Sequence, residues 1–204
     1  MEHIRALKDP FPHLIVENMY DEKELELIWE ELEFLNKPGK LENPENYGAA
    51  KVENEYATNS KAIILDDVYA DRNISNILKI NRKIFNYSEI YSKLSPYHLK
   101  FLYCNMDITK IRYYHNKEFY LAHQDKKFDT LACTYFYKEP KKFTGGELFF
   151  PEYNYIVESK NNSCIIFPSY FLHEVLQVKI ADCDYYSGFG RYCMSQFTNI
   201  IEKK

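Results

Sequence analysis

Residues 130–137 read TLACTYFY, a run in which β-branched, aromatic and small apolar residues follow one another. Residues of these types favour extended strands. Similar short runs, broken by turn residues, fill the rest of the second half of the chain: KFLYCNM (100–106), ITKIRYY (108–114), GELFF (146–150), YNYIVES (153–159), SCIIF (163–167), FLHEVLQV (171–178) and RYCMSQFTNI (191–200). Because no helix-sized segment separates them, the pattern predicts a sandwich or jelly roll rather than alternating β-α units.

The first half of the chain carries helical signals instead. Residues 21–36 place apolar side chains at the three- and four-residue spacing of one helical face, and Asp21 with Glu24 forms a plausible capping pair at its start. Residues 61–67 (KAIILDD) predict a strand. Two further segments predict short helices: residues 72–85 and residues 87–94.

These elements define the expected domain organisation. Residues 36–60 are polar and rich in Asn, Gly, Pro and Glu, which indicates either a mobile loop or a flap. We expect a single domain over residues 1–204, with a mostly helical N-terminal support (1–98) and a β core (99–204). The fold class is therefore mainly β (α+β), with the N-terminal helices packed on one sheet.

Composition limits the classes of function. The net charge of −4 provides no broad basic field, so nucleic acid is not an expected partner. The five cysteines are scattered without a C-x-x-C pair, which argues against a disulfide scaffold or a zinc ribbon and fits a reducing cytoplasm. No apolar stretch is long enough to span a bilayer, and we expect a soluble, intracellular protein. The oligomeric state is left open.

A candidate metal site begins at His123, Gln124 and Asp125. On a strand, residues i and i+2 share a face, so His123 and Asp125 could bind one ion. His173 follows fifty residues later within an apolar strand. Two imidazoles and one carboxylate form the facial triad that holds Fe(II) in oxygen-using enzymes. The alternative for His173 is a core histidine whose ring nitrogens are hydrogen-bonded to neighbours.

A candidate anion-binding residue lies on the last predicted strand. Alternation places Arg191, Cys193, Ser195 and Phe197 on one face. A buried guanidinium in a jelly-roll interior suits a dicarboxylate, because its planar fork binds carboxylates in two-pronged geometry. The alternative is an arginine that faces solvent or joins a salt bridge.

The order and spacing of these motifs resemble a known family. The segments YYHNKEFYLAHQD (113–125), GGELFFPE (145–152), FPSYFLHEV (167–175) and GRY (190–192) are similar to those of 2-oxoglutarate- and Fe(II)-dependent oxygenases, most of all the prolyl 4-hydroxylase type. The resemblance covers roughly residues 100–200, and the opening PFPHLIVENMY with the first helix is similar to compact members, some of them carried by tailed phages. It implies a double-stranded β-helix core, and the host cytoplasm as location if the gene belongs to a phage.

The resemblance also implies roles for individual residues. His123, Asp125 and His173 would be the iron ligands. Arg191 would pair with the distal carboxylate of 2-oxoglutarate. The remaining roles are cosubstrate contacts from Tyr113, Tyr135 and Leu148, and a position at the substrate-binding pocket mouth for Asp129 and Phe197.

Two departures from the family pattern keep alternatives open. The turn between Tyr113 and His123 lacks the glycine often found there, so Tyr114 could take the role of Tyr113. The segment between His173 and Arg191 is longer than the family pattern suggests, so Lys179 is an alternative partner for the cosubstrate carboxylate.

The implied activity is a dioxygenase reaction that uses Fe(II), 2-oxoglutarate and O₂, with ascorbate as a candidate reductant. Proline in a peptide or protein is the expected substrate. The alternatives are a hydroxylase of another residue, of a free amino acid or of a small metabolite, and a non-catalytic jelly-roll module that retained a metal site.

Overall fold

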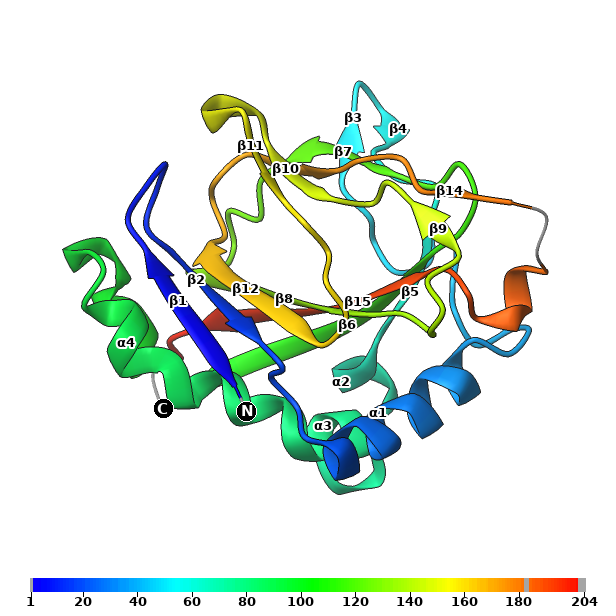
Figure 1. Cartoon of the computed structure of the whole chain (residues 1–204), viewed down its shortest axis with the longest axis horizontal. Coiled ribbons are helices and arrows are strands. Elements are labelled where there is room, and N and C mark those ends of the chain that lie inside the picture. Colours follow the sequence, from blue (N-terminus) through cyan, green and yellow to red (C-terminus); the bar gives the residue numbers. More distant parts are fainter. Residues whose placement is uncertain (1, 182–183, 202–204) are drawn as a thin grey trace.

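The largest element of the computed structural model, which describes residues 2–181 and 184–201, is a seven-stranded antiparallel sheet (Figure 1). In spatial order its strands are β1 (His3–Leu7), β2 (His13–Glu17), β12 (Ser163–Pro168), β8 (Thr130–Phe136), β15 (Arg191–Asn199), β6 (Met106–Tyr114) and β5 (Lys61–Ile64). The last strand of the chain, β15, lies inside the sheet and pairs with both β8 and β6. Its residues therefore sit at the centre of the molecule.

A smaller antiparallel sheet lies opposite the large one (Figure 1). Its order is β11 (Tyr155–Val157), β10 (Leu148–Phe150), β13 (His173–Val175) and β7 (Tyr120–His123). Two short strand pairs complete the β-structure: β9 (Phe143–Thr144) with β14 (Lys179–Ile180), and β3 (Lys51–Val52) with β4 (Glu55–Tyr56). Apolar side chains from both sheets, such as Ile165 and Phe150, fill the space between them. This double-layered antiparallel architecture confirms the predicted jelly roll.

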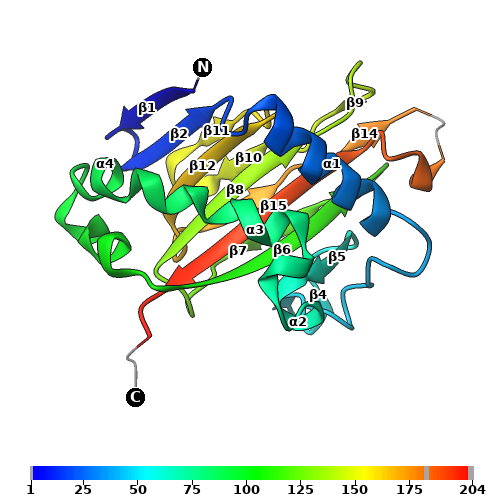
Figure 2. The same cartoon turned by 90° about the horizontal axis from the view of Figure 1, so that it is seen from below.

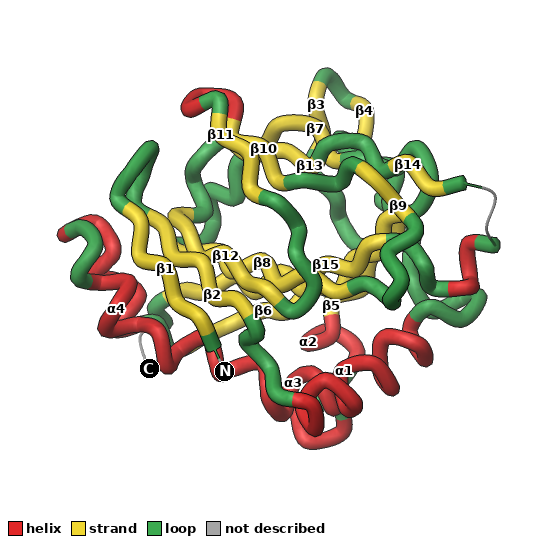
Figure 3. Tube along the Cα trace, in the orientation of Figure 1, coloured by secondary structure: helices red, strands yellow, loops and turns green. Residues whose placement is uncertain are grey.

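Helices cover the outer face of the large sheet (Figures 2 and 3). The α-helices are α1 (Glu22–Leu35), α2 (Leu65–Val68), α3 (Asn76–Ile80) and α4 (Ser88–Ser92). The chain also contains the 3₁₀ turns η1 (Arg72–Ile74), η2 (Asn81–Tyr87), η3 (Pro96–Tyr103), η4 (Pro151–Tyr153) and η5 (Tyr185–Ser187). The predicted capping box of α1 is present, since Asp21 accepts from the Glu24 backbone and Glu24 accepts from the Asp21 backbone. Among the described residues, none of the helices has the length and apolar character needed to cross a membrane.

The large sheet has two apolar faces. On β8, Ala132 and Phe136 pack on the helical side, whereas Leu131, Cys133 and Tyr135 face the inside of the sandwich. Trp29 of α1 lies edge-on against Phe136. Burial on both faces explains why TLACTYFY is almost continuously apolar rather than alternating.

The N-terminal region differs from the mostly helical support expected for residues 1–98. It contributes β1, β2 and β5 to the large sheet. β2 pairs with β12 about 150 residues later, where Val16 is opposite Cys164. Because these partners are so distant in sequence, the short run HLIVE gives little local evidence of a strand.

Three further segments differ from the secondary structure predicted for them. Residues 100–103 form the end of turn η3 rather than a strand, because Phe101 is buried against Tyr91 and Phe85 in the helical layer, and β6 begins only at Met106. Residues 72–85 form three short helical segments, since Ser75 caps a new helix in the middle of the run. Residues 36–60 contain the β3–β4 hairpin and are therefore not wholly a loop.

Candidate active site

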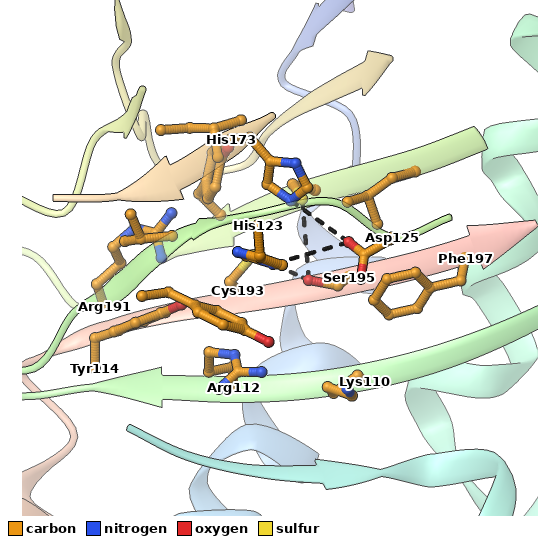
Figure 4. Close-up of a pocket in the computed structure, with 16 residues that line it drawn as sticks. Lys110, Arg112, Tyr114, His123, Asp125, His173, Arg191, Cys193, Ser195 and Phe197 are labelled. Carbon is orange, nitrogen blue, oxygen red and sulfur yellow. Dashed lines mark hydrogen bonds and ion pairs between the residues drawn. The ribbon is translucent and has the colours of Figure 1, made fainter. Parts of the chain in front are cut away.

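Three potential metal ligands meet at one end of the small sheet (Figure 4). His123 ends β7 and His173 begins β13, and the two residues are direct cross-strand partners. Asp125 lies two residues after the end of β7, and its Oδ2 lies 3.5 Å from His173 Nε2 and 3.9 Å from His123 Nε2. One ligand atom from each residue lies within 4.8 Å of the others. The structure thus brings together the three residues that the sequence predicted as a triad.

Backbone contacts orient both imidazoles toward the centre of this triad. Nδ1 of His123 is 2.8 Å from the Leu121 carbonyl, and Nδ1 of His173 is 2.8 Å from the Phe171 carbonyl. Since a carbonyl oxygen can only accept, each Nδ1 carries the proton and each Nε2 is left with a free lone pair when the ring is neutral. The ring of His123 also stacks on Tyr120, with 3.7 Å between the centroids.

The electrostatics of the triad suit a metal ion. Burial, reinforced by the nearby His173, lowers the pKa of His123 to about 3, so its ring is neutral at physiological pH. Burial opposes the charged form of Asp125, but its interactions with His173, His123 and Lys110 outweigh that effect and lower the Asp125 pKa. A neutral His123 ring and an ionised Asp125 carboxylate are in the protonation states that metal ligands require. The donor set fits Fe(II) held by a facial triad with open positions.

Arg191 is a buried cation at the far end of the same pocket. Its side chain is fully buried, its Nε donates to Ser159 Oγ at 3.0 Å, and both Nη atoms are buried without a hydrogen-bond partner. No described carboxylate lies within ion-pair distance of it. An unpaired buried charge costs several kcal/mol. A carboxylate supplied by a ligand would remove this cost.

Aromatic rings and a glycine shape the space around Arg191. Its guanidinium carbon lies 5.0 Å from the centre of the Tyr114 ring and 4.6 Å from that of Tyr135. The Tyr135 hydroxyl is also buried without a partner. A Cβ on Gly146 would come within 2.8 Å of Arg191 Cδ. The glycine therefore makes room for the guanidinium, while the Arg191 fork and the Tyr135 hydroxyl are free to hydrogen-bond a dicarboxylate.

The structure distinguishes between the two tyrosines considered on β6. Tyr114 lines the pocket, whereas Tyr113 is on the opposite face of the sheet, where its hydroxyl accepts from Gly190 N at 2.9 Å and its ring packs on Tyr192. Tyr113 therefore does not face the pocket, whereas Tyr114, the alternative considered from the sequence, does. The two differ because a strand has a two-residue period, so that a shift of one position changes the face.

Some of the other predicted site residues line the pocket and others do not. Tyr135, Leu148 and Phe197 line the pocket. Asp129 does not line it, because its carboxylate forms an ion pair with Lys100 at 2.9 Å beside a separate surface depression. Lys179 is exposed on β14 and also lies outside the pocket lining. Of these two cations, Arg191 is thus the one that lines the inner pocket.

Sequence reasoning missed two cations in the pocket. Lys110 and Arg112 line it from β6, on the same face as Tyr114 (Figure 4). Burial, with repulsion from Arg112, lowers the pKa of Lys110 to about 8, which leaves it mostly charged at neutral pH. The signal was present in the sequence, since the alternation of ITKIRYY assigns these three side chains to one face.

The described cysteines are buried or half-buried. Cys133 and Cys193 line the pocket, and the four described cysteines are free thiols. Cys183 lies outside the described residues.

Comparison with known proteins agrees with this geometry. Residues 109–199 match the family model of the 2OG-Fe(II) oxygenase superfamily. A search among curated protein sequences found no match. The matched region contains His123, Asp125, His173 and Arg191.

Several solved prolyl hydroxylases share the fold. A prolyl 4-hydroxylase from Pseudomonas putida is 16% identical, with 93% of each chain covered and a TM-score of 0.56. A viral collagen prolyl hydroxylase from Paramecium Bursaria Chlorella virus-1, solved as a 2OG complex, is 13% identical, with 96% of this chain and 100% of that chain covered and a TM-score of 0.59. A Trichoplax adhaerens prolyl hydroxylase bound to a hypoxia inducible factor peptide is 13% identical, with 91% and 82% covered and a TM-score of 0.60.

The family match identifies residues 109–199 as a 2OG-Fe(II) oxygenase domain. The protein is accordingly a 2-oxoglutarate-dependent dioxygenase that uses Fe(II), 2-oxoglutarate and O₂. Its fold is the one found in prolyl 4-hydroxylases.

Proposed function

We propose that this protein hydroxylates proline in a peptide or protein substrate, and that His123, Asp125 and His173 bind its iron. The observation that carries the assignment is the combination, in one pocket, of the three converging ligands with an unpartnered Arg191 fork. The fold shared with the prolyl hydroxylases supports proline as the target. When bound, Fe(II) and 2-oxoglutarate supply oxidative decarboxylation to succinate coupled to hydroxylation of a C–H bond.

The residues of the chain position the reactants. The two Nε2 atoms and the Asp125 carboxylate would hold the metal on one side and leave its other positions open. Arg191 would bind the distal carboxylate of 2-oxoglutarate in two-pronged geometry, and Tyr135 would donate a hydrogen bond to it. Leu148 and Tyr114 would close the walls of this compartment and exclude water.

A surface depression next to the triad provides space for the substrate. It has a volume of about 490 Å³ and shares Lys110, Tyr120, Asp125 and Phe197 with the inner pocket. Ile64, Ile108 and the aromatic rings of Tyr47 and Phe128 give it a largely apolar lining. Such a lining suits a pyrrolidine ring and the chain that carries it.

We also propose that residues 1–204 act as one oxygenase domain. The N-terminal strands β1, β2 and β5 are part of the same sheet as β6, β8, β12 and β15. Removing them would expose both edges of the β core.

The test is turnover of 2-oxoglutarate. Purified protein with Fe(II) and ascorbate should convert 2-oxoglutarate to succinate, and proline-containing peptides should increase the rate and gain one oxygen atom by mass spectrometry. His173→Ala should be inactive, and His3→Ala, at an exposed position, is the matched control. If free proline or another residue gains the oxygen while proline peptides do not, the substrate assignment is wrong. The absence of any succinate would favour a non-catalytic module.

A further inference from the structure

Lys110 and Arg112 form a pair of cations on the face of β6 that lines the inner pocket. Lys110 lines both the inner pocket and the depression, and its Nζ lies 5.4 Å from the ring centres of both Tyr47 and Phe197. Arg112 is 4% exposed and lies deeper along β6. Lys110 thus lies where the two cavities meet, and Arg112 follows it along β6 toward Tyr114 (Figure 4).

The two cations differ in how firmly they are fixed. Arg112 Nη1 donates to Tyr47 Oη at 2.6 Å and to Ser60 Oγ at 2.9 Å, and the guanidinium stacks near the Tyr120 ring at 4.6 Å. The Lys110 ammonium forms no hydrogen bond or ion pair with any described residue; it contacts the two rings and lies within electrostatic reach of Asp125 and Asp67. Arg112 is therefore a fixed charge, whereas the Lys110 ammonium is available to a ligand.

Protein carboxylates do not neutralise this pair. Asp125 is the sole carboxylate among the described residues that line the inner pocket, and it belongs to the metal triad. Two carboxylates outside this lining act on the pair electrostatically, Asp67 on Lys110 and Glu118 on Arg112, but neither forms an ion pair with it, and the Glu118 carboxylate accepts from the His115 backbone at 2.7 Å. With Asp125, a divalent metal, the 2-oxoglutarate dianion and Arg191 together neutral, Lys110 and Arg112 remain two positive charges without an ion-paired carboxylate.

The outer depression continues the positive character. Lys126 and Lys127 are exposed and line it together with Lys110. Its lining again contains Asp125 and no other described carboxylate. An uncompensated positive region at the mouth of a site attracts anions and raises their rate of association.

We infer that the substrate carries a carboxylate close to the proline that is oxidised, and that Lys110 binds this carboxylate while Arg112 supplies a fixed positive field behind it. The inference rests on the proposed function, because it treats the depression as the binding place of a proline peptide. The carboxylate could come from an Asp or Glu side chain or from the C-terminus of the peptide. In either case Lys110 would select the substrate by charge.

Peptide binding tests the inference without turnover. Short peptides with a central proline would carry Asp, Asn or Lys on either side, each with a free or an amidated C-terminus. Affinity is measured for protein loaded with Mn(II) and 2-oxoglutarate in the absence of O₂. We expect the peptide bearing the favoured carboxylate to bind about tenfold more tightly than its neutral counterpart, since hydrogen bonds between charged groups are stronger than neutral ones. The position of Asp, or the free C-terminus, identifies the source of the carboxylate.

Variants of Lys110 connect this preference to the side chain. Lys110→Met should abolish the preference, and Lys110→Arg should retain it. Lys179→Met removes an exposed lysine outside the pocket and should bind peptides like the wild type. A preference that persists in Lys110→Met, or equal binding of acidic and neutral peptides to the wild type, would overturn the inference.

Turnover separates this inference from the proposed function. Proline hydroxylation that ignores peptide charge would refute the inference and leave the proposed function standing. Preferential binding of acidic peptides without hydroxylation would refute the proposed function and leave the preference for a carboxylate standing.

Discussion

At the residue scale, Arg191 is held in place by contacts that leave its binding groups free. Ser159 accepts from its Nε and in turn donates to the Gly146 carbonyl at 2.8 Å. The two Nη atoms are therefore aimed into the pocket with no protein partner. This arrangement is stable only if the burial of the charge is offset by surrounding packing and by a bound anion.

Arg191→Lys keeps the positive charge but loses the planar fork. We expect the KM for 2-oxoglutarate to rise by about tenfold or more, because a two-pronged contact is reduced to a single one. Metal affinity should change little, since Arg191 is not a member of the triad. Steady-state kinetics and Co(II) titration measure the two quantities. An unaltered dependence on 2-oxoglutarate would assign the carboxylate to another residue.

His173→Ala removes one of three converging donors. We expect loss of metal binding and of turnover, because two remaining ligands hold a divalent ion much less tightly. The far-ultraviolet circular dichroism spectrum should stay close to that of the wild type. Co(II) binding followed by calorimetry provides the measurement, with His3→Ala as the exposed control. Unchanged Co(II) affinity in His173→Ala would contradict the triad.

The site residues could be predicted to different degrees from the sequence. The spacing of His123 and Asp125 and the alternation around Arg191 indicated side chains that the structure does place in one pocket. The choice between Tyr113 and Tyr114 depended on the exact phase of β6, which is set by pairing with β15 and not by local residues. Asp129 was misplaced because its position depends on a loop and on its ion pair with Lys100.

At the scale of single elements, the segment 36–60 is held at its base by hydrogen bonds. Tyr47 donates to the Ser60 carbonyl at 3.0 Å, and Ala50 N donates to the Tyr120 hydroxyl at 3.3 Å. The β3–β4 hairpin beyond this base is largely exposed. The segment thus combines a buried base with an exposed tip beside the proposed substrate depression.

We predict that the hairpin acts as a flap over the substrate. Without peptide, amide hydrogen exchange should be fast at Lys51–Tyr56 and slower at the hydrogen-bonded base. Adding a peptide that is turned over, to protein holding 2-oxoglutarate and Mn(II) without O₂, should slow exchange at the tip. Exchange that remains fast at the tip would show that the hairpin does not close over the substrate.

The elements themselves were predictable where the signal was local. The helix α1 was expected from its apolar spacing and its capping pair, and both are present. The strands β1 and β2 were not expected, because each is short and depends on pairing with residues far along the chain. Local propensity cannot report such a partner.

At the scale of the whole molecule, the helical layer and the β sandwich share the large sheet. The layer contains a buried histidine, His98 in η3, which stacks on Tyr91 of α4 with 4.4 Å between ring centroids. Its Nε2 is buried without a hydrogen-bond partner. Protonating this ring would place a charge inside the layer, so burial lowers the pKa of His98 to about 4.

The last prediction is that His98 makes the fold sensitive to mild acid. Its pKa in the folded state lies below the ordinary value of 6.5, so between pH 6.5 and 4 the unfolded chain binds more protons and stability falls as pH falls. From pH 7 to 5 this amounts to roughly 2 kcal/mol of unfolding free energy. His98→Phe keeps the stacking on Tyr91 and removes the titration, so metal-free variant protein should lose less stability than metal-free wild type over this interval. Parallel urea denaturation curves at both pH values measure the difference, and equal losses in the two proteins would show that other groups govern the acid response.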